Sequence, residues 1–268
     1  MLRANHDWHS GTKHPSPRNP ATVLHMTAVI LAAGRSSRLL PLTAETPKCL
    51  LPVGQHTMLE RTVNSLLRNG ATSIALVVGF QSEKIISFVG SRWPGETIRF
   101  IENPDFACTN NAYSLLLARD AVASESLLLL DSDILFDDEI LRQILMTAED
   151  VACAMRTQGA ISSEDIKIEL ADAFRIRRIG KDIPLSSAAG ESIGIEKFSA
   201  EATRLLFQTL AKRVTSEKRI NEFYEASFQE MIDGGQTFHA MDVRHLSCIE
   251  VDTEEDLLSA WEMLAQGD

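Results

Sequence analysis

The chain has 268 residues, with 26 Lys and Arg against 37 Asp and Glu, so its net charge is −11 with His neutral. That length suits one large α/β domain or two small ones. No apolar run approaches the ~20 residues of a membrane-spanning helix, which argues against an integral membrane protein, and the acidic balance argues against a broad surface for duplex DNA.

Residues 1–25 are polar and irregular, and they hold four of the seven histidines (His6, His9, His14 and His25). They lack the apolar stretch of a secretory signal. We expect a disordered tail here. Two alternatives stay open: the histidines bind a metal, or Met26 is the true first residue.

Strands and helices alternate between residues 26 and 149. Apolar runs predict buried strands, and amphipathic segments between them predict helices, the first of which is stopped by Gly70. Such alternation indicates a mostly parallel sheet between layers of helices. The strands are expected at 28–33, 74–78, 98–101 and 127–130, and the helices at 58–68, 83–88 and from 110 or 111 to about 121.

The pattern is looser from residue 150 onward. A final helix begins at Thr253, where Thr253 and Asp256 have the spacing of a capping box. We predict one α/β domain over 26–268, a Rossmann-like, mixed and mostly parallel sheet flanked by helices, with a first half (26–149) and a smaller substrate-facing half (150–268). In the second half, strands are expected at 151–155, 166–170, 174–179, 191–197, 236–242 and 246–251, and helices at 200–212 and 220–232.

The four cysteines (Cys49, Cys108, Cys153 and Cys248) lie far apart and form no C-x-x-C pair. Such spacing fits reduced thiols better than a disulfide framework or a zinc site. We therefore expect a cytoplasmic location.

The most informative segment follows the first strand. Leu31-Ala32-Ala33-Gly34-Arg35-Ser36-Ser37-Arg38-Leu39 runs from the strand into a loop of small residues, and Lys48 follows Pro47. Gly34 lets the backbone approach a ligand closely, and successive N–H groups of such a loop point at phosphate oxygens. Arg38 can bind a phosphate through two N–H groups, and Lys48 adds a point charge. The segment predicts a phosphate-binding loop.

Two adjacent asparagines stand where a loop after the third strand leads into a helix. Asn110 and Asn111 follow Asn103 and precede Tyr113 and Ser114. Their amide and hydroxyl groups offer donors and acceptors suited to a cytosine edge or a ribose. The alternative is structural, with asparagine as a helix cap and Tyr113 in the core.

Two carboxylates follow the fourth strand, in Asp131-Ser132-Asp133. Open α/β sheets bind their ligands at this edge, and paired carboxylates suit a hard cation. The alternative is that both are helix-capping or solvated residues ahead of the acids at 137–139.

The stretch from Val29 to Lys48 resembles the opening of the nucleotidyltransferase family that includes sugar-nucleotide pyrophosphorylases and phosphocholine cytidylyltransferases. That opening is a strand, then L-A-A-G-x-G-[ST]-R-L, a Pro and a Thr, and P-K; Ser36 stands at the second glycine. The resemblance implies Mg²⁺-dependent transfer of a nucleoside monophosphate from a nucleoside triphosphate to an anionic acceptor, with release of pyrophosphate. Arg38 and Lys48 would be the catalytic residues.

The segment from Asn103 to Ser114 resembles the N-x-x-[YF]-x-x-x-N-N-x-Y-S of the cytidylyltransferase branch, and Gly79-Phe80 matches the loop beside the base. Sugar-nucleotide enzymes usually carry a different segment here. CTP is therefore the implied nucleotide, and 26–149 the nucleotide-binding half. The resemblance implies nucleotide contacts from Leu31, Ala33, Gly34, Arg35, Ser36, Ser37, Gly79, Asn110, Asn111, Ser114 and Asp131.

The same resemblance implies a Mg²⁺ site. Asp133 corresponds to the aspartate of the family's [GA]-D pattern. The run that begins at Glu250 resembles E-[IV]-D-[ST]-x-x-D, which makes Asp252 the second ligand. Glu250, Glu254 and Glu255 are expected to be surface acids of a capped helix.

The acceptor is implied by two further stretches. Residues 190–198 resemble the G-E-x-[IV]-G-[IV]-x-[KR]-F strand of cytidylyltransferases for phosphocholine-like or phosphonate acceptors, so Glu191 is expected to hold an ammonium group and Lys181 a phosphoryl group. Residues 221–225 correspond to a D-x-Y-W region of phosphocholine enzymes and include Tyr224, with Glu225 at the tryptophan.

The missing tryptophan bears on whether the acceptor carries a quaternary or a primary ammonium group. Choline is bound by aromatic cages, whereas a primary ammonium needs carboxylate or carbonyl acceptors. Glu191, Glu222 or Glu225 therefore favour an amine-bearing acceptor such as 2-aminoethylphosphonate. We predict a cytidylyltransferase that uses CTP and such an acceptor, without nucleic acid or membrane, as a possible homodimer.

Three alternatives remain: a phosphocholine enzyme, a sugar-1-phosphate pyrophosphorylase, and a regulatory subunit without turnover. A dinucleotide-dependent dehydrogenase is excluded because no G-x-G-x-x-G follows the first strand.

Overall fold

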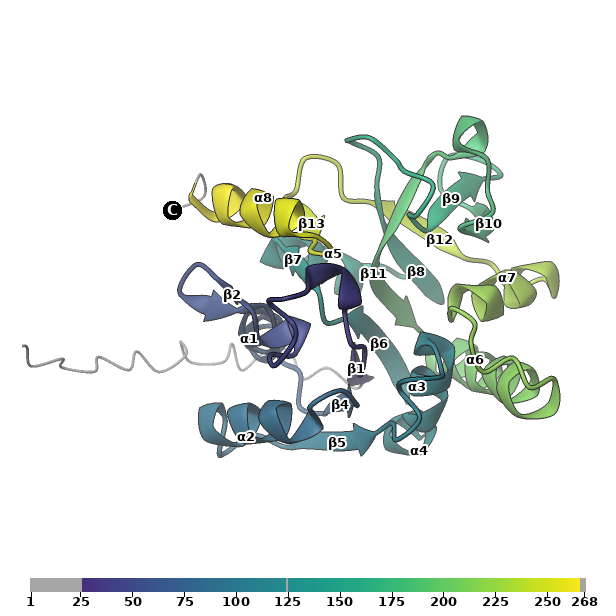
Figure 1. Ribbon diagram of the computed structural model, residues 1–268. Helices are drawn as coiled ribbons and strands as arrows, with labels where there is room; N and C mark the ends of the chain where they lie inside the picture. The colour runs from purple at the N-terminus through teal and green to yellow at the C-terminus, as the bar shows by residue number, and fades with distance from the viewer. Residues whose placement is uncertain (1–25, 124, 266–268) are drawn as a thin grey trace, which may run out of the picture.

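The centre of the molecule is a nine-stranded sheet, and the computed structural model describes residues 26–123 and 125–265. The predicted tail over 1–25 lies outside the described residues. Seven strands run in the order β10-β9-β11-β6-β1-β4-β5, and β8 pairs with β11 and β12 (Figure 1). The strands are β1 (Met26–Ala32), β4 (Ile74–Val78), β5 (Ile98–Glu102), β6 (Ser126–Asp131), β8 (Val151–Arg156), β9 (Lys167–Leu170), β10 (Ile176–Gly180), β11 (Gly190–Phe198) and β12 (His239–Asp242).

The first half of the chain contributes only parallel pairs to this sheet, β1 with β4 and β6, and β4 with β5. The antiparallel pairs come with the second half, where β11 lies against β6, β8 and β9. The predicted α/β class with a mixed, mostly parallel sheet is confirmed.

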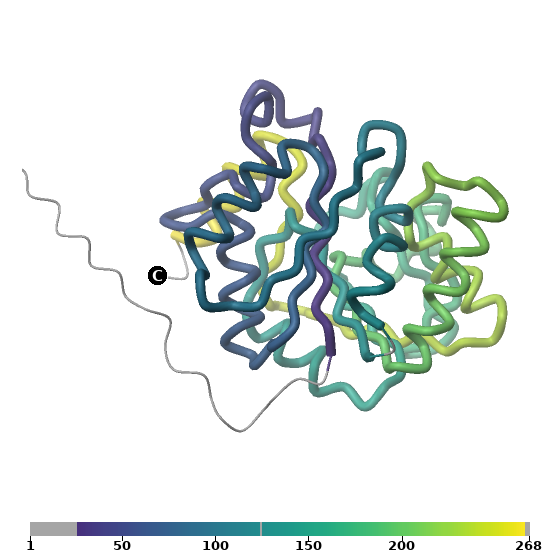
Figure 2. The backbone as a smooth tube through the Cα atoms, turned by 90° about the horizontal axis from the view of Figure 1, so that it is seen from below, coloured from purple at the N-terminus to yellow at the C-terminus, as the bar shows by residue number. Residues whose placement is uncertain are grey.

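Helices cover both faces of the sheet because alternate residues of the buried strands point to opposite sides. In β1, Val29 and Leu31 pack in one core, and Ala28 and Ile30 in the other. Figure 2 shows the helices of the two layers on either side of β1. The first layer has α3 (Asn111–Leu117), α4 (Arg119–Val122), α6 (Ala200–Ala211) and α7 (Glu225–Asp233), and the second has α1 (Met58–Arg68), α2 (Ser82–Arg92) and α5 (Asp138–Met146).

A third, smaller core lies beneath the last helix, α8 (Glu254–Ala265). Its members include Val53, Leu135 and Val251. These residues belong to or adjoin two short ribbons, and α8 packs against the ribbon that contains β2 (Figure 1). The ribbons are β2 (Pro52–Val53) with β3 (His56–Thr57), and β7 (Ile134–Phe136) with β13 (Cys248–Glu250).

Local signals explain where the helices begin. The Thr57 hydroxyl accepts from the Glu60 N–H at 3.1 Å at the start of α1. At the start of α8, Thr253 Oγ1 accepts from the Asp256 N–H at 3.2 Å, while Asp256 Oδ2 accepts from the Thr253 N–H at 2.8 Å. This reciprocal pair confirms the predicted capping box.

Several predicted boundaries are wrong. The helix expected from 220 begins only at Glu225, because the Asn110 and Ala112 N–H groups bind the carbonyls of Ile220 and Glu222, which a helix would have used itself. The helix expected over 110–121 is broken at Ala118 into α3 and α4. The sequence did not predict α5, β7 or the β2–β3 ribbon. None of the described helices has the length and apolar character needed to cross a membrane.

Candidate functional site

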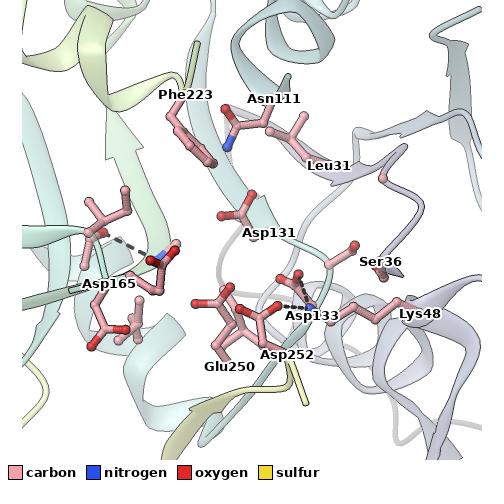
Figure 3. A pocket seen from close by; sticks show the side chains of 18 of the residues that line it. Leu31, Ser36, Lys48, Asn111, Asp131, Asp133, Asp165, Phe223, Glu250 and Asp252 are labelled. Carbon is pink, nitrogen blue, oxygen red and sulfur yellow. Dashed lines mark hydrogen bonds and ion pairs between the residues drawn. The ribbon is translucent and has the colours of Figure 1, made fainter. Parts of the chain in front are cut away.

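A cavity of about 730 Å³ lies at the carboxyl ends of β1 and β6, and residues 191–194 of β11 contribute to its wall (Figure 3). Both halves of the chain contribute to its wall. Of the residues expected from the sequence, those in the wall are Leu31, Ala33, Gly34, Ser36, Arg38, Lys48, Asn110, Asn111, Ser114, Asp131, Asp133, Lys181, Glu191, Glu225 and Asp252. Those outside it are Arg35, Ser37, Gly79, Glu222 and Tyr224.

The predicted phosphate loop forms the rim of the cavity beyond β1. Ser36 has φ 52° and ψ 56°, the left-handed conformation that favours glycine, so the residue that departs from the family pattern occupies a position that needs glycine's freedom. Its carbonyl accepts from the Thr43 hydroxyl at 2.8 Å, which fixes the turn. Arg35 is not among the residues that line the cavity, and its guanidinium lies 5.7 Å from the Phe80 ring centroid.

We expect Ser36→Val to lower the free energy of unfolding by about 1–2 kcal/mol, because a β-branched side chain clashes with the backbone in the left-handed region. Ser37→Val is the matched control, since Ser37 is exposed and has no positive φ, and it should change stability by less than ~0.5 kcal/mol. Denaturant unfolding of both variants measures the difference. Equal effects would contradict the conformational argument.

Lys48 joins the two predicted metal ligands. Its side chain is 6% exposed, and Nζ donates to Asp133 Oδ2 at 2.8 Å and to Asp252 Oδ1 at 2.7 Å (Figure 3). Arg38 Nη2 lies 2.7 Å from the other oxygen of Asp252. Burial alone would lower the pKa of Lys48, but the charges of Asp133 and Asp252 outweigh it and raise that pKa, so Lys48 stays cationic.

The donor set fits a divalent cation. One carboxylate oxygen each from Asp133, Glu250 and Asp252 lie within 4.8 Å of one another, and Asp133 Oδ1 is buried without a hydrogen-bond partner. Carboxylate oxygens are hard ligands of the kind that Mg²⁺ and Ca²⁺ take.

Glu250 is a member of this site that the sequence analysis placed on the surface. Its carboxylate faces Asp133 and Asp252, and loss of hydration together with those two charges raises the pKa of Glu250 to about 8. The spacing E-x-D is the signal that could have found it, because residues i and i+2 of an extended segment point to the same side.

The three asparagines before and at the start of α3 have different hydrogen-bond partners. Asn103 is buried and donates to Ser114 Oγ at 3.0 Å, so it braces the turn. Asn110 accepts from the Asn111 N–H at 2.8 Å and caps its own helix. Asn111 accepts from the Tyr224 N–H at 2.9 Å through Oδ1, which leaves Nδ2 directed toward the cavity (Figure 3). The start of α3 therefore links the first half of the chain to the second.

Gly79 does not line the cavity, but it packs against two residues that do. A Cβ atom there would lie 2.8 Å from the Ala33 carbonyl oxygen and 2.8 Å from Phe106 Cβ. The position lets the end of β4 pack closely against the phosphate loop.

A group of acidic side chains lies in the cavity wall where the two halves of the chain meet. The Tyr224 hydroxyl is buried and donates to Asp131 Oδ2 at 2.9 Å. Burial and the neighbouring Asp133 and Glu225 charges raise the pKa of Asp131 well above its usual range. Glu225 is 4% exposed, and its Oε2 has no hydrogen-bond partner among the described residues. Burial raises the pKa of Glu225 to about 7.

The other expected ammonium ligands are already paired. Glu191 forms an ion pair with Arg156, a cavity residue that the sequence analysis did not select. Burial and a hydrogen bond with Asp165 raise the pKa of Glu191 to about 7, although Arg156 opposes the rise. Glu222 lies outside the wall, where Arg213 binds its Oε2 at 2.7 Å.

Comparison with known proteins places these features in a family. The model described as "MobA-like NTP transferase domain" matches residues 28–225. The 2-aminoethylphosphonate cytidylyltransferase of Lancefieldella rimae is 30% identical over 179 residues, 66% of this chain and 69% of that protein. The CMP-5'-(3-aminopropyl)phosphonate synthase of Streptomyces rubellomurinus is 28% identical over 238 residues, 85% of this chain but only 37% of that protein.

The solved structure of the CTP:phosphocholine cytidylyltransferase from Streptococcus pneumoniae shares the fold. It has a TM-score of 0.74 and 23% identity, and the match covers 90% of this chain and all of that one.

Proposed function

The chain belongs to the MobA-like NTP transferase family, and on that premise we propose that it is a cytidylyltransferase. In this proposal it moves CMP from CTP to a small amine-bearing phosphonate or phosphate, 2-aminoethylphosphonate first of all, and releases pyrophosphate. Two relatives carry aminoalkylphosphonates in their names. A cytoplasmic location and a homodimer stay predictions from the sequence.

The observation that carries the amine-bearing acceptor is the Glu225 Oε2 atom, which is buried and has no hydrogen-bond partner among the described residues. Glu225 lines the same cavity as Lys48 and Asp133. A buried carboxylate oxygen without a partner is costly. A primary ammonium would offset that cost by donating charge-assisted hydrogen bonds. Glu225 is therefore the ammonium ligand in this proposal, ahead of Glu191 and Glu222, which arginines already neutralise.

The opposite side of the cavity offers the groups that a nucleoside triphosphate needs. The loop from Gly34 to Arg38 presents backbone N–H groups, and Arg38 with Lys48 adds two cations for the phosphates. Asn111 Nδ2 points into the cavity beside Leu31 and suits an acceptor atom of the base or ribose (Figure 3).

Transfer of CMP from CTP to the acceptor depends on positioning of the two substrates and does not require a proton-transfer step. A phosphonate oxygen is already anionic near pH 7, so no general base is required, and we assign none. The residues hold the acceptor oxygen near the α-phosphate, while Lys48 and Arg38 balance the charge that develops on the departing pyrophosphate. A divalent cation held by Asp133, Glu250 and Asp252 would supply further charge neutralisation and orientation.

A pyrophosphate-release screen tests the proposal. Each of four nucleoside triphosphates is paired with 2-aminoethylphosphonate, phosphoethanolamine, phosphocholine, glucose-1-phosphate and inositol-1-phosphate. We expect CTP with 2-aminoethylphosphonate to give the highest kcat/KM, at least ~10-fold above phosphocholine, since one charge-assisted hydrogen bond can supply that ratio. A preference for UTP or dTTP with a sugar phosphate would contradict the proposed function and support a pyrophosphorylase instead.

Glu225 also predicts a pH dependence. Its pKa of about 7 means that the carboxyl takes up a proton as the pH falls through 7, and the neutral acid no longer attracts an ammonium. The acceptor amine stays protonated throughout, as a lysine amine would. We expect the ratio of kcat/KM for 2-aminoethylphosphonate, wild type over Glu225→Gln, to rise as the pH is raised from 6 to 8. The acceptor's own ionisation cancels in this ratio.

Glu222→Gln is the matched control for that profile. Glu222 lies three residues before Glu225 but outside the cavity wall, where it is paired with Arg213. The ratio of wild type to Glu222→Gln should be flat over the same pH range. A flat ratio for Glu225→Gln as well would remove the assignment of the ammonium to Glu225.

A further inference from the structure

The cavity contains an aromatic surface beside the proposed ammonium site. Phe106 and Phe223 are the aromatic side chains that line it among the described residues. Phe106 belongs to the nucleotide half, where it packs edge-on against Phe80 with ring centroids 6.2 Å apart. Phe223 is 40% exposed, stands two residues before Glu225, and points its ring into the cavity (Figure 3).

An aromatic ring next to a carboxylate is by itself a suitable site for a quaternary ammonium. Such a group donates no hydrogen bond and is held by the face of a ring and by Coulomb attraction. The hydrogen bond to Glu225 favours a primary amine, but it does not keep a trimethylammonium group off the face of Phe223. A feature that covers this face would strengthen the preference.

Lys181 is placed to do this. Its Nζ lies 4.6 Å from the centroid of the Phe223 ring. On its other side, Nζ is 3.6 Å from Glu164 Oε2, in the segment between β8 and β9 that forms part of the cavity wall. The ammonium of Lys181 thus occupies the ring face, and two contacts hold it there.

We propose that Lys181 is a specificity residue that excludes quaternary-ammonium acceptors by keeping its own ammonium on the face of Phe223. The inference rests on the proposed cytidylyltransferase function and refines its acceptor class. A trimethylammonium group would have to displace Lys181 from the ring or share the ring with its like charge. A primary ammonium needs only the oxygen of Glu225, so it loses less binding free energy when Lys181 covers the ring. This differs from the role expected from the sequence, in which Lys181 binds the phosphoryl group.

The test is the ratio of kcat/KM for phosphocholine to kcat/KM for 2-aminoethylphosphonate. Lys181→Ala should raise this ratio at least ~10-fold. The substitution exposes the face of the ring, and the attraction of an aromatic ring for a cation is large enough to change the ratio by about that factor. Lys181→Arg, which keeps a cation for the ring, should leave the ratio within ~3-fold of wild type. Adding Phe223→Leu to Lys181→Ala should abolish the gain, since the ring is then absent.

Two results would overturn the inference. If Lys181→Ala lowers the use of both acceptors by the same factor, Lys181 binds the phosphoryl group common to them. If the gain survives Phe223→Leu, the ring is not the surface that Lys181 covers. Lys212→Ala, at an exposed lysine paired with Glu230, controls for the loss of a surface charge.

Failure of the proposed function gives a different result. In that case the wild type transfers CMP to neither acceptor. Calorimetric dissociation constants for phosphocholine and 2-aminoethylphosphonate then replace kcat/KM in the same set of variants. An unchanged ratio of these constants in Lys181→Ala would overturn the role of Lys181 independently of turnover.

Discussion

Asp133→Asn and Asp252→Asn are each expected to lower kcat/KM by at least ~100-fold, about 2.7 kcal/mol of transition-state stabilisation. Each change removes an anionic oxygen from the three-carboxylate group that fits a divalent cation. Asparagine keeps the size of the side chain and one oxygen, so the fold should persist. Steady-state kinetics over a range of Mg²⁺ concentrations measures the loss.

Asp138→Asn is the matched control for these variants. Asp138 lies five residues beyond Asp133, but its carboxylate is half-exposed and pairs with Arg68 at the surface. Its kcat/KM should stay within ~3-fold of wild type, as expected for a surface pair of small energetic weight. Calorimetric titration with Mg²⁺ adds a readout besides turnover, in which Asp133→Asn and Asp252→Asn bind the ion more weakly than Asp138→Asn does. Near-normal turnover in both site variants would place the cation elsewhere.

Lys48→Met is expected to lower kcat/KM by at least ~100-fold and also to destabilise the fold. Its ammonium is buried between Asp133 and Asp252, at 2.8 and 2.7 Å. Methionine keeps most of the length but leaves the two carboxylates facing each other without the cation. Removing one partner from such a group costs about 1–3 kcal/mol in free energy of unfolding.

Arg38→Ala separates the two effects of Lys48. Arg38 contacts the same Asp252, but its side chain is 57% exposed, so little stability depends on it. It should lose at least ~10-fold in kcat/KM for CTP with less than ~0.5 kcal/mol in stability. If both variants lost stability only, the loop and Lys48 would be structural and the assignment of the phosphates to this wall would fail.

Elements whose signals lie within a few residues of one another could be predicted from the sequence alone. The strand over 74–78 and the helix over 58–68 were predicted to the residue, because an apolar run or an amphipathic repeat is complete within the segment. The capping box of Thr253 and Asp256 is equally local. The loop from Leu31 to Lys48 carried enough specific residues to indicate the family that the comparisons confirm.

Which charged groups meet, and which stay without a partner, depends on how distant parts of the chain fold together. Lys48 and Asp252 are 204 positions apart, and their contact depends on α8 and β13 returning to the mouth of β1. Arg156 neutralises Glu191 because β8 pairs with β11 in the register that sets these two residues opposite each other. Glu222 and Glu225 look alike in the sequence, yet the late start of α7 turns one toward Arg213 and buries the other in the cavity wall. The physical reason is that periodicity and capping act over one or two turns of chain, whereas the surroundings of a charge are set by the order and register of strands far apart in the sequence.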